Sequence, residues 1–167
     1  STQATHRNHV WTWDFIFDRT DKGSTLKMLT MLDEYTRQCL AIRVERQIRS
    51  GQVLATLWQA MMTYGIPEHI RSDNGSEFIA QKIQEWLKES QIKTLYIDPG
   101  SPWQNGYIES FHSRFRDECL NREWLLNLRE ARVVIEDWRQ YYNIERPHSR
   151  LGYLSPEGFI ANQNVSL

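Results

Sequence analysis

Polar and apolar residues alternate over the first forty-five or so positions, which indicates short strands. Over residues 11–17 the aromatic side chains fall on one face, while Thr12, Asp14 and Ile16 fall on the other. Similar runs follow at about residues 26–32 and 38–44, separated by polar turns at 18–24 and 33–37. Three short strands joined by tight turns predict an antiparallel meander.

The spacing of apolar residues changes after Ser50, which is the expected N-cap of a helix that ends at Gly65 and Pro67. A short strand just before Asp73, a helix over 77–90 and a strand over 92–97 follow. The order β-β-β-α-β-α-β predicts a mixed five-stranded sheet, its first three strands antiparallel, flanked by helices. The expected core-facing positions of these two helices are Val53, Leu54, Leu57, Trp58, Met61, Met62, Ile79, Ile83, Trp86 and Leu87.

The second half of the chain is mainly helical. Residues 98–104 hold two prolines and a glycine, which exclude regular structure. In a helix over 105–121, Asn105, Glu109 and Arg116 lie on one rim of the buried stripe formed by Ile108, Phe111, Phe115 and Cys119. A capping box of Asn127 and Glu130 opens the next helix, and a short final helix begins at 155–157. The inner face of the longer helix should carry Val134, Ile135, Trp138, Tyr141 and Tyr142.

Composition describes one ordinary globular domain. The 167 residues can bury a core, and no apolar run approaches the roughly 18 residues of a membrane span. Cys39 and Cys119 have no metal-site spacing, so we expect reduced side chains near the core. We expect residues 1–8 to be a flexible tail and 9–167 to be a catalytic core excised from a longer protein.

Two aspartates are candidates for metal binding or catalysis. Asp14, in the middle of a strand of aromatic and aliphatic residues, costs several kcal/mol if buried unpaired. It therefore needs either an arginine such as Arg43 or a hard divalent cation. Asp73 ends a strand just before Asn-Gly, which is a turn signal whatever the function but also a usual place for a functional carboxylate. With Glu109 from a helix, these carboxylates can hold two ions about 4 Å apart for chemistry at phosphorus.

Together the motifs resemble the catalytic core of retroviral-type integrases, and most closely the insertion-sequence-3 group of bacterial transposases. The resemblance rests on Asp14, on SDNGSEF at 72–78 and on PGSPWQNGYIESF at 99–111. Thirty-five residues, 74–108, separate Asp73 from Glu109, as in the DD(35)E pattern. YN at 142–143, RPH at 146–148, LG at 151–152 and SP at 155–156 match the C-terminal pattern of that group. The match runs from about residue 11 to 159.

The resemblance implies an RNase H-like fold and an enzyme that cuts and transfers DNA strands. It implies two Mg²⁺ or Mn²⁺ ions held by Asp14, Asp73 and Glu109. Asn105 and Arg116 match positions that face the DNA ends. The implied partners are mobile-element ends and target DNA, bound by a homo-oligomer in the bacterial cytoplasm and nucleoid, with no membrane.

Three other positions keep two interpretations each. Arg146 and His148 are either DNA contacts or a structural tie of the C-terminal segment. His112 stands where the group usually has an aromatic residue, and packing beside Phe111 and Phe115 is the favoured interpretation.

Two features limit the resemblance. The upstream helix-turn-helix region of that group does not occur in this sequence, and a net charge of −1 predicts weak duplex binding. Two rival functions share the expected fold: a catalytically silent DNA- or protein-binding module, and a nuclease for RNA–DNA hybrids.

Overall fold

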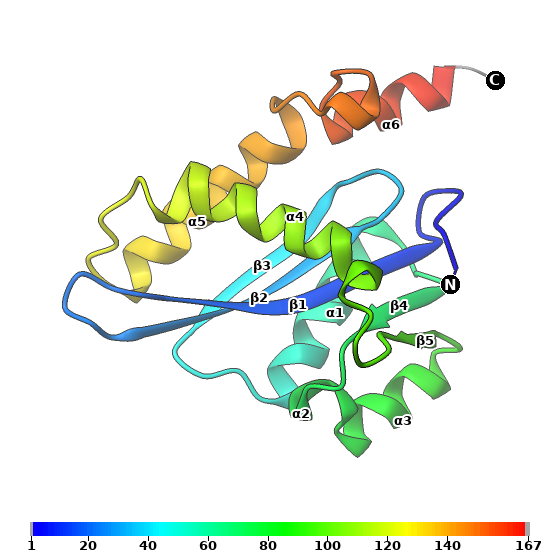
Figure 1. Cartoon of the computed structure of the whole chain (residues 1–167), viewed down its shortest axis with the longest axis horizontal. Helices are drawn as coiled ribbons and strands as arrows, with labels where there is room; N and C mark the ends of the chain where they lie inside the picture. The colour runs from blue at the N-terminus through cyan, green and yellow to red at the C-terminus, as the bar shows by residue number, and fades with distance from the viewer. Residues whose placement is uncertain (1, 166–167) are drawn as a thin grey trace.

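The computed structural model describes residues 2–165 and contains one five-stranded sheet in the order β3-β2-β1-β4-β5 (Figure 1). β1 (Val10–Arg19), β2 (Thr25–Asp33) and β3 (Cys39–Glu45) are antiparallel. β4 (His69–Ser72) runs parallel to β1, and β5 (Lys93–Tyr96) runs parallel to β4. The predicted mixed sheet with an antiparallel first half is confirmed.

One face of the sheet packs against α1 (Ser50–Tyr64), α2 (Ser76–Ile79) and α3 (Gln81–Glu89). Trp11 and Trp13 of β1 lie in the core on this face, as the alternation predicted. The helices derive from the crossover half of the chain, which must cover the sheet to link parallel strands.

The opposite face packs against α4 (Gly106–Phe115) and α5 (Leu128–Ile144), with Ile16 of β1 in that second core. A 3-10 turn (Pro102–Asn105) precedes α4, and a π-helical segment (Arg116–Leu120) continues it. The expected stripe of Ile108, Phe111, Phe115 and Cys119 is buried. After a 3-10 turn (Ser149–Leu151), α6 (Pro156–Val165) lies beyond the end of α5 (Figure 1).

Two expectations for α1 were wrong. Its N-cap is Arg49, whose backbone N–H donates to the Gln52 side chain, so Ser50 is already helical. Trp58 and Met62 are 54% and 70% exposed. At about 100° per residue they lie more than a quarter-turn from Leu57, which faces the sheet, and one flat sheet covers a narrower face.

The helix expected over 77–90 is two helices. Ala80, with φ −52° and ψ 137°, is extended and separates α2 from α3. The backbone turns there because Phe78 is held in the core, where its ring stacks on Trp13 and Phe15 at centroid distances of 4.8 Å. As a result Ile79, expected to point inward, is 48% exposed.

In α5 the cap is simpler than predicted. The Asn127 side chain accepts a hydrogen bond from the Glu130 backbone N–H at 2.9 Å, which is one half of the expected capping box. Tyr141 is 43% exposed instead of buried, because it lies at the edge of the face centred on Trp138 and Tyr142. Both cysteines are free and buried, as expected.

The segment before β1, expected to be a flexible tail, contacts the domain in this structure. The Asn8 backbone N–H donates to Asp33 at 2.8 Å, and the Asn8 side chain donates to the Tyr64 carbonyl at 2.8 Å. The Thr2 carbonyl accepts from Arg71, and His6 pairs with Glu68. Among residues 2–165, no helix has both the length and the apolar character that crossing a membrane requires.

Candidate active site

The pairing of β1 with β4 brings Asp14 and Asp73 level with each other. Thr12 of β1 is the partner of Arg71 of β4 in this parallel pair. Asp14 and Asp73 each lie two residues further along, so the two residues are carried to the same level of the sheet. Asp14 is in the middle of β1, and Asp73 directly follows the last residue of β4, at the carboxyl end of that strand, where open α/β sheets place ligands.

A tight turn after β4 orients Asp73. Its Oδ1 accepts the backbone N–H of Gly75 at 2.7 Å, which is the Asx geometry that favours such turns. A Cβ on Gly75 would lie 2.9 Å from the same Oδ1, so only glycine leaves this carboxylate in place. Phe78, three residues later, fixes the turn against β1 through its two ring stacks.

The pKa of the Asp14 carboxyl is raised to about 6. Burial is the largest cause, and the charge and hydrogen bonding of Asp73 act in the same direction. Hydrogen bonds from the Phe15 backbone N–H, at 2.8 Å, and from the Asn105 side chain act in the opposite direction. These interactions show that Asp14, Asp73 and Asn105 come together.

No cation of the chain neutralises the aspartate pair. Arg43, the alternative partner for Asp14, instead pairs with Glu45 at 3.1 Å and donates to Thr56. Within the described part of the chain, neither Asp14 nor Asp73 forms an ion pair with a lysine, arginine or histidine. The two carboxylates therefore face each other without a counter-charge, which is costly unless an external cation binds.

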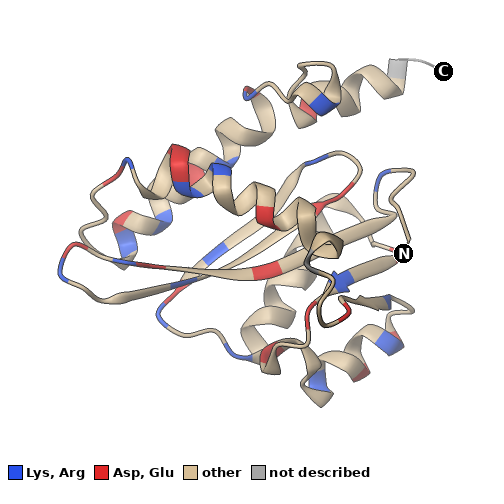
Figure 2. Ribbon diagram, in the orientation of Figure 1, with Lys and Arg blue, Asp and Glu red and all other residues tan. Residues whose placement is uncertain are grey.

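Glu109 lies on α4, which packs over β1, and its side chain is exposed. Figure 2 shows acidic positions in the middle of β1 and on α4. Across residues 2–165, no three Asp, Glu, His or Cys side chains lie close enough together to hold a metal ion. The structure thus brings together two of the three predicted carboxylates, and Glu109 stays apart from them.

Two hydrogen bonds tie α4 to the sheet beside Asp14. Thr30 of β2, the cross-strand partner of Asp14, donates to the Asp14 carbonyl at 3.1 Å and contacts His112 Nε2 at 2.6 Å. Because the Thr30 hydroxyl proton is already used, His112 must donate from Nε2. Burial lowers the pKa of His112 to about 4, so it is neutral near pH 7. One turn further on, Arg116 donates to the Phe17 carbonyl at 3.0 Å.

The two remaining predicted contact residues lie after α5. Arg146 forms a bidentate ion pair with Glu118, with a shortest distance of 2.6 Å. His148 is 6% exposed, meets the Tyr142 ring edge-on at 4.7 Å, and has an Nε2 without a hydrogen-bond partner. In this structure both residues hold the C-terminal segment against α4 and α5.

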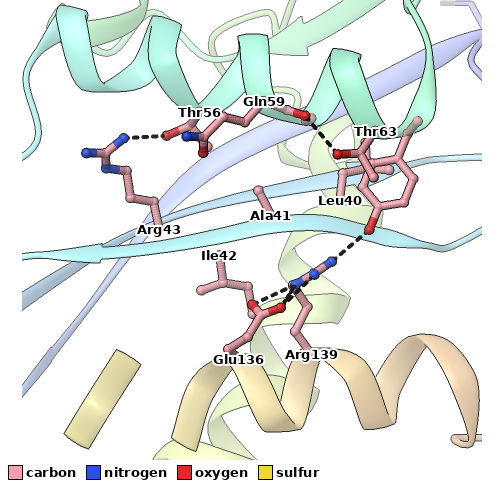
Figure 3. A pocket seen from close by; sticks show the side chains of 11 residues that line it. Leu40, Ala41, Ile42, Arg43, Thr56, Gln59, Thr63, Glu136 and Arg139 are labelled. Atoms are coloured by element: carbon pink, nitrogen blue, oxygen red, sulfur yellow. Dashed lines mark hydrogen bonds and ion pairs between the residues drawn. The ribbon is translucent and has the colours of Figure 1, made fainter. Parts of the chain in front are cut away.

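A separate hollow of about 380 Å³ lies between α1, β3 and α5, away from the carboxylates (Figure 3). Its charged groups are paired within the chain: Arg139 binds Glu136 at 2.7 Å and the Tyr64 hydroxyl at 3.0 Å. Figure 3 shows the Arg139 guanidinium turned toward the Glu136 carboxylate. Because the charged groups that line this hollow are paired within the chain, it offers no unpaired charge for catalysis.

Sequence reasoning missed Thr30 and Phe78 as residues that position the site. Thr30 is a fully buried hydroxyl in an apolar strand, and that contrast is a signal in the sequence. Phe78 gave no such signal, because an aromatic residue three positions after a turn fits an ordinary core equally well.

Comparison with known proteins identifies the family. Residues 4–102 match a model described as "Integrase core domain", and residues 90–156 match a second model with the same description. The "Insertion element IS476 uncharacterized 39.2 kDa protein" of Xanthomonas euvesicatoria is 43% identical over 155 residues, covering 93% of this chain and 45% of that protein. The "Insertion element IS407 uncharacterized 31.7 kDa protein" of Burkholderia multivorans is 40% identical over 159 residues, covering 95% and 57%. The chain thus spans about half the length of these relatives.

The fold has a counterpart among solved structures. The structure of the HTLV-2 integrase catalytic core domain in complex with magnesium has a TM-score of 0.67 and 20% sequence identity, covering 94% of this chain and 98% of that one. This likeness confirms the predicted RNase H-like fold. Together with the matched models and the two insertion-element relatives, it shows that the chain belongs to the integrase core domain family.

Proposed function

We propose that this chain is the catalytic domain of a DNA transposase of the insertion-sequence-3 group, which cleaves and transfers DNA strands. The observation that carries the proposal is the pair of adjacent carboxylates, Asp14 in the middle of β1 and Asp73 at the carboxyl end of the parallel strand β4, with no counter-charge from residues 2–165. Family membership and the insertion-element relatives support the same conclusion.

The donor set fits a divalent metal. Asp14 and Asp73 supply hard oxygen ligands, and Oδ1 of Asn105 is buried beside Asp14 without a hydrogen-bond partner. Mg²⁺ and Mn²⁺ prefer such oxygen donors. Asp14, Asp73 and Glu109 would hold two ions, with Glu109 reaching them by a movement of its side chain and of the 98–105 loop. When bound, such ions activate the attacking hydroxyl and stabilise the leaving oxygen at phosphorus.

The residues of the chain position the catalytic carboxylates and the DNA end. Asp14 and Asp73 are fixed by strand pairing and by the Gly75 turn, so they meet the reacting phosphate in one geometry. His112 and Arg116 hold α4, and therefore Glu109, over β1. Asn105 sits beside Asp14 at the start of the helix, and its amide would orient the DNA end. Little covalent chemistry remains for the protein.

The partners in this proposal are the ends of a mobile element and target DNA, bound by a homo-oligomer in the bacterial cytoplasm. The retained acidic positions argue against a catalytically silent module. The proline-rich loop before Glu109, which is part of the integrase resemblance, argues against a hybrid-cutting nuclease.

The test is strand transfer by the full-length protein in Mn²⁺ with element-end duplexes. Asp14→Asn, Asp73→Asn and Glu109→Gln each keep the size of the side chain but remove an anionic ligand, so each should reduce the rate below about a tenth, or more than ~1.4 kcal/mol in barrier. Asp137→Asn, on the exposed side of α5, is the matched control and should leave the rate unchanged. Retention of more than a tenth of the rate by any of the three, or preferential cutting of an RNA–DNA hybrid, would refute the assignment.

A further inference from the structure

A second cavity lies on the side of α4 away from Glu109. Its volume is about 800 Å³, and its walls come from α4, the β2–β3 turn, the loop before α4 and the segment after α5. These elements meet above the start of β1 in Figure 1. Tyr107, Ser110 and Arg114 are the α4 side chains that line it, and at about 100° per residue they lie roughly 100° to 160° around the helix from Glu109.

The cavity carries a surplus of positive charge. Besides Arg71, which is paired with Glu34, four arginines from three separate segments line it: Arg37, Arg114, Arg146 and Arg150. Arg146 is paired with Glu118. Within residues 2–165, Arg37, Arg114 and Arg150 have no carboxylate partner.

The two acidic residues of the wall are already engaged. Asp33 accepts three backbone N–H groups, from Asn8, Tyr35 and Thr36, at 2.8 to 3.1 Å. Glu34 forms a buried ion pair with Arg71 at 2.8 Å. Within residues 2–165, neither forms an ion pair with Arg37, Arg114 or Arg150. Figure 2 shows basic positions on the second half of α4 and in the segment after α5.

Two polar atoms in the wall lack partners. Nε2 of His148, a residue that is 6% exposed, has no hydrogen-bond partner, and neither has Nε of Arg37. Burial, followed by the charges of Arg146, Arg114 and Arg37, lowers the pKa of His148 to about 4, which shows that these guanidinium groups act on one point. Unsatisfied polar groups inside a cationic cavity are suited to an anionic ligand that accepts hydrogen bonds.

Aromatic rings stand beside the arginines. The Arg37 guanidinium lies 3.9 Å from the centroid of the Tyr107 ring. Trp103 and Tyr153 also line the cavity and are 74% and 75% exposed. Arg37 and Tyr153 hold left-handed backbone conformations, with φ of 64° and 65°, which are uncommon outside glycine and asparagine and often occur at functional sites.

We propose that this cavity binds one or two unpaired nucleotides of a DNA strand, with arginines on the phosphates and aromatic rings stacked on the bases. Alternating guanidinium and aromatic groups are the usual means of binding single strands without sequence preference. The volume falls in the range of small-ligand sites, and a double helix is far too wide to enter. The arginine and aromatic groups alone indicate a single-stranded nucleic acid, and only the choice of DNA over RNA rests on the proposed function.

The cavity and the carboxylates are connected along the chain. Trp103 and Gln104 line the cavity, and Asn105, the next residue, contacts Asp14. A strand held at Asp14 and Asp73 can thus pass over the N-terminus of α4 and place its unpaired end among the arginines.

The test is the binding of a fluorescein-labelled single strand about ten nucleotides long to the 167-residue chain, followed by anisotropy at about 0.1 M salt. Each phosphate contact on a single strand contributes about 0.7 to the slope of log K against log salt. At about 0.1 M salt, the loss of one such contact corresponds to about fivefold weaker binding, which is the effect expected of Arg114→Gln. Arg129→Gln removes an exposed charge of the same type from α5, outside the cavity, and should change nothing. Equal losses in the two variants would overturn the proposal, because they would indicate general attraction to the protein surface.

Two further binding measurements identify the class of ligand in the cavity. Trp103→Leu should weaken the binding of an intact strand but not of an abasic strand of equal charge, because only the intact strand has bases that can stack. A duplex of the same sequence should respond little to Arg114→Gln. Equal loss on duplex and single strand, tighter binding of single-stranded RNA, or displacement by polyglutamate as effective as displacement by unlabelled DNA would each overturn the proposal. Because this assay measures binding and not strand transfer, its result does not depend on the catalytic assignment of Asp14, Asp73 and Glu109.

Discussion

The two sides of α4 carry unpaired charges of opposite sign. On one side, Asp14 and Asp73 lie level on neighbouring strands without a cation from residues 2–165, and the exposed Glu109 stays apart from them. On the other side, Arg37, Arg114 and Arg150 surround a cavity whose two acids are occupied. The hollow between α1, β3 and α5 shows what a structural region does instead, because its Arg139 is fully paired (Figure 3). Charge left unpaired by the fold marks the places where a ligand supplies the counter-charge.

The largest effect should come from Gly75→Ala. The backbone there, with φ −56° and ψ 142°, suits any residue, so the only conflict is the added Cβ at 2.9 Å from Asp73 Oδ1. Because a shift of about 1 Å in a catalytic group can cost about a hundredfold, strand transfer should fall by that factor while the melting temperature barely changes. Gly106→Ala, where a Cβ meets nothing within 4 Å, is the control and should keep its activity. A rate for Gly75→Ala within threefold of wild type would show that the Asp73 turn does not position the site.

Divalent metal should stabilise the acidic side. Cations that bind only the folded state relieve the repulsion between Asp14 and Asp73, so millimolar Mn²⁺ should add on the order of 1–3 kcal/mol to the free energy of unfolding. Denaturant titrations with and without Mn²⁺ measure this gain, which Asp73→Asn should largely remove. An equal gain in both proteins would place the metal elsewhere, and no gain in wild type would mean that the aspartate pair does not bind it.

A smaller effect should appear when metal is chelated. The Asp14 carboxyl has a folded pKa of about 6, raised by burial and then by Asp73 from an ordinary value of 3.8. Between these pH values the folded state binds more protons than the unfolded state, so the contribution of Asp14 to stability falls as pH rises through 6. Asp14→Asn avoids the buried charge and, after allowance for solvent screening, should be more stable than wild type by about 1–2 kcal/mol at pH 7.

Chemical denaturation in EDTA at pH 7 and below pH 4 checks this sign. The advantage of Asp14→Asn should vanish at the lower pH, where wild-type Asp14 is protonated. Asp137→Asn, at an exposed site, should stay within about 0.5 kcal/mol of wild type at both pH values. An Asn variant less stable than wild type at pH 7 would show that the Asp14 charge is already compensated within the fold.

The sequence predicted the sheet better than the helices that cover it. Strand alternation over 11–17 gave the correct faces because period-2 patterns depend only on neighbouring residues. The predicted buried faces of the helices were too wide, because they included four residues that are exposed: Trp58, Met62, Ile79 and Tyr141. A run of apolar side chains fixes the direction of a helix face, but its width depends on how much of the helix the sheet covers.

The amino-acid sequence by itself determined the order of elements, the expensive carboxylate in β1 and the spacing from Asp73 to Glu109. These follow from local periodicity and from the cost of burying a charge. Only the tertiary structure decided that Asp14 and Asp73 lie level, because that depends on the register of strands far apart in the chain. It also decided that Glu109 stands apart, that Thr30 and His112 tie α4 to β1, and that arginines from three segments meet in one cavity. Contacts between residues far apart in the chain produce no periodic pattern in the sequence.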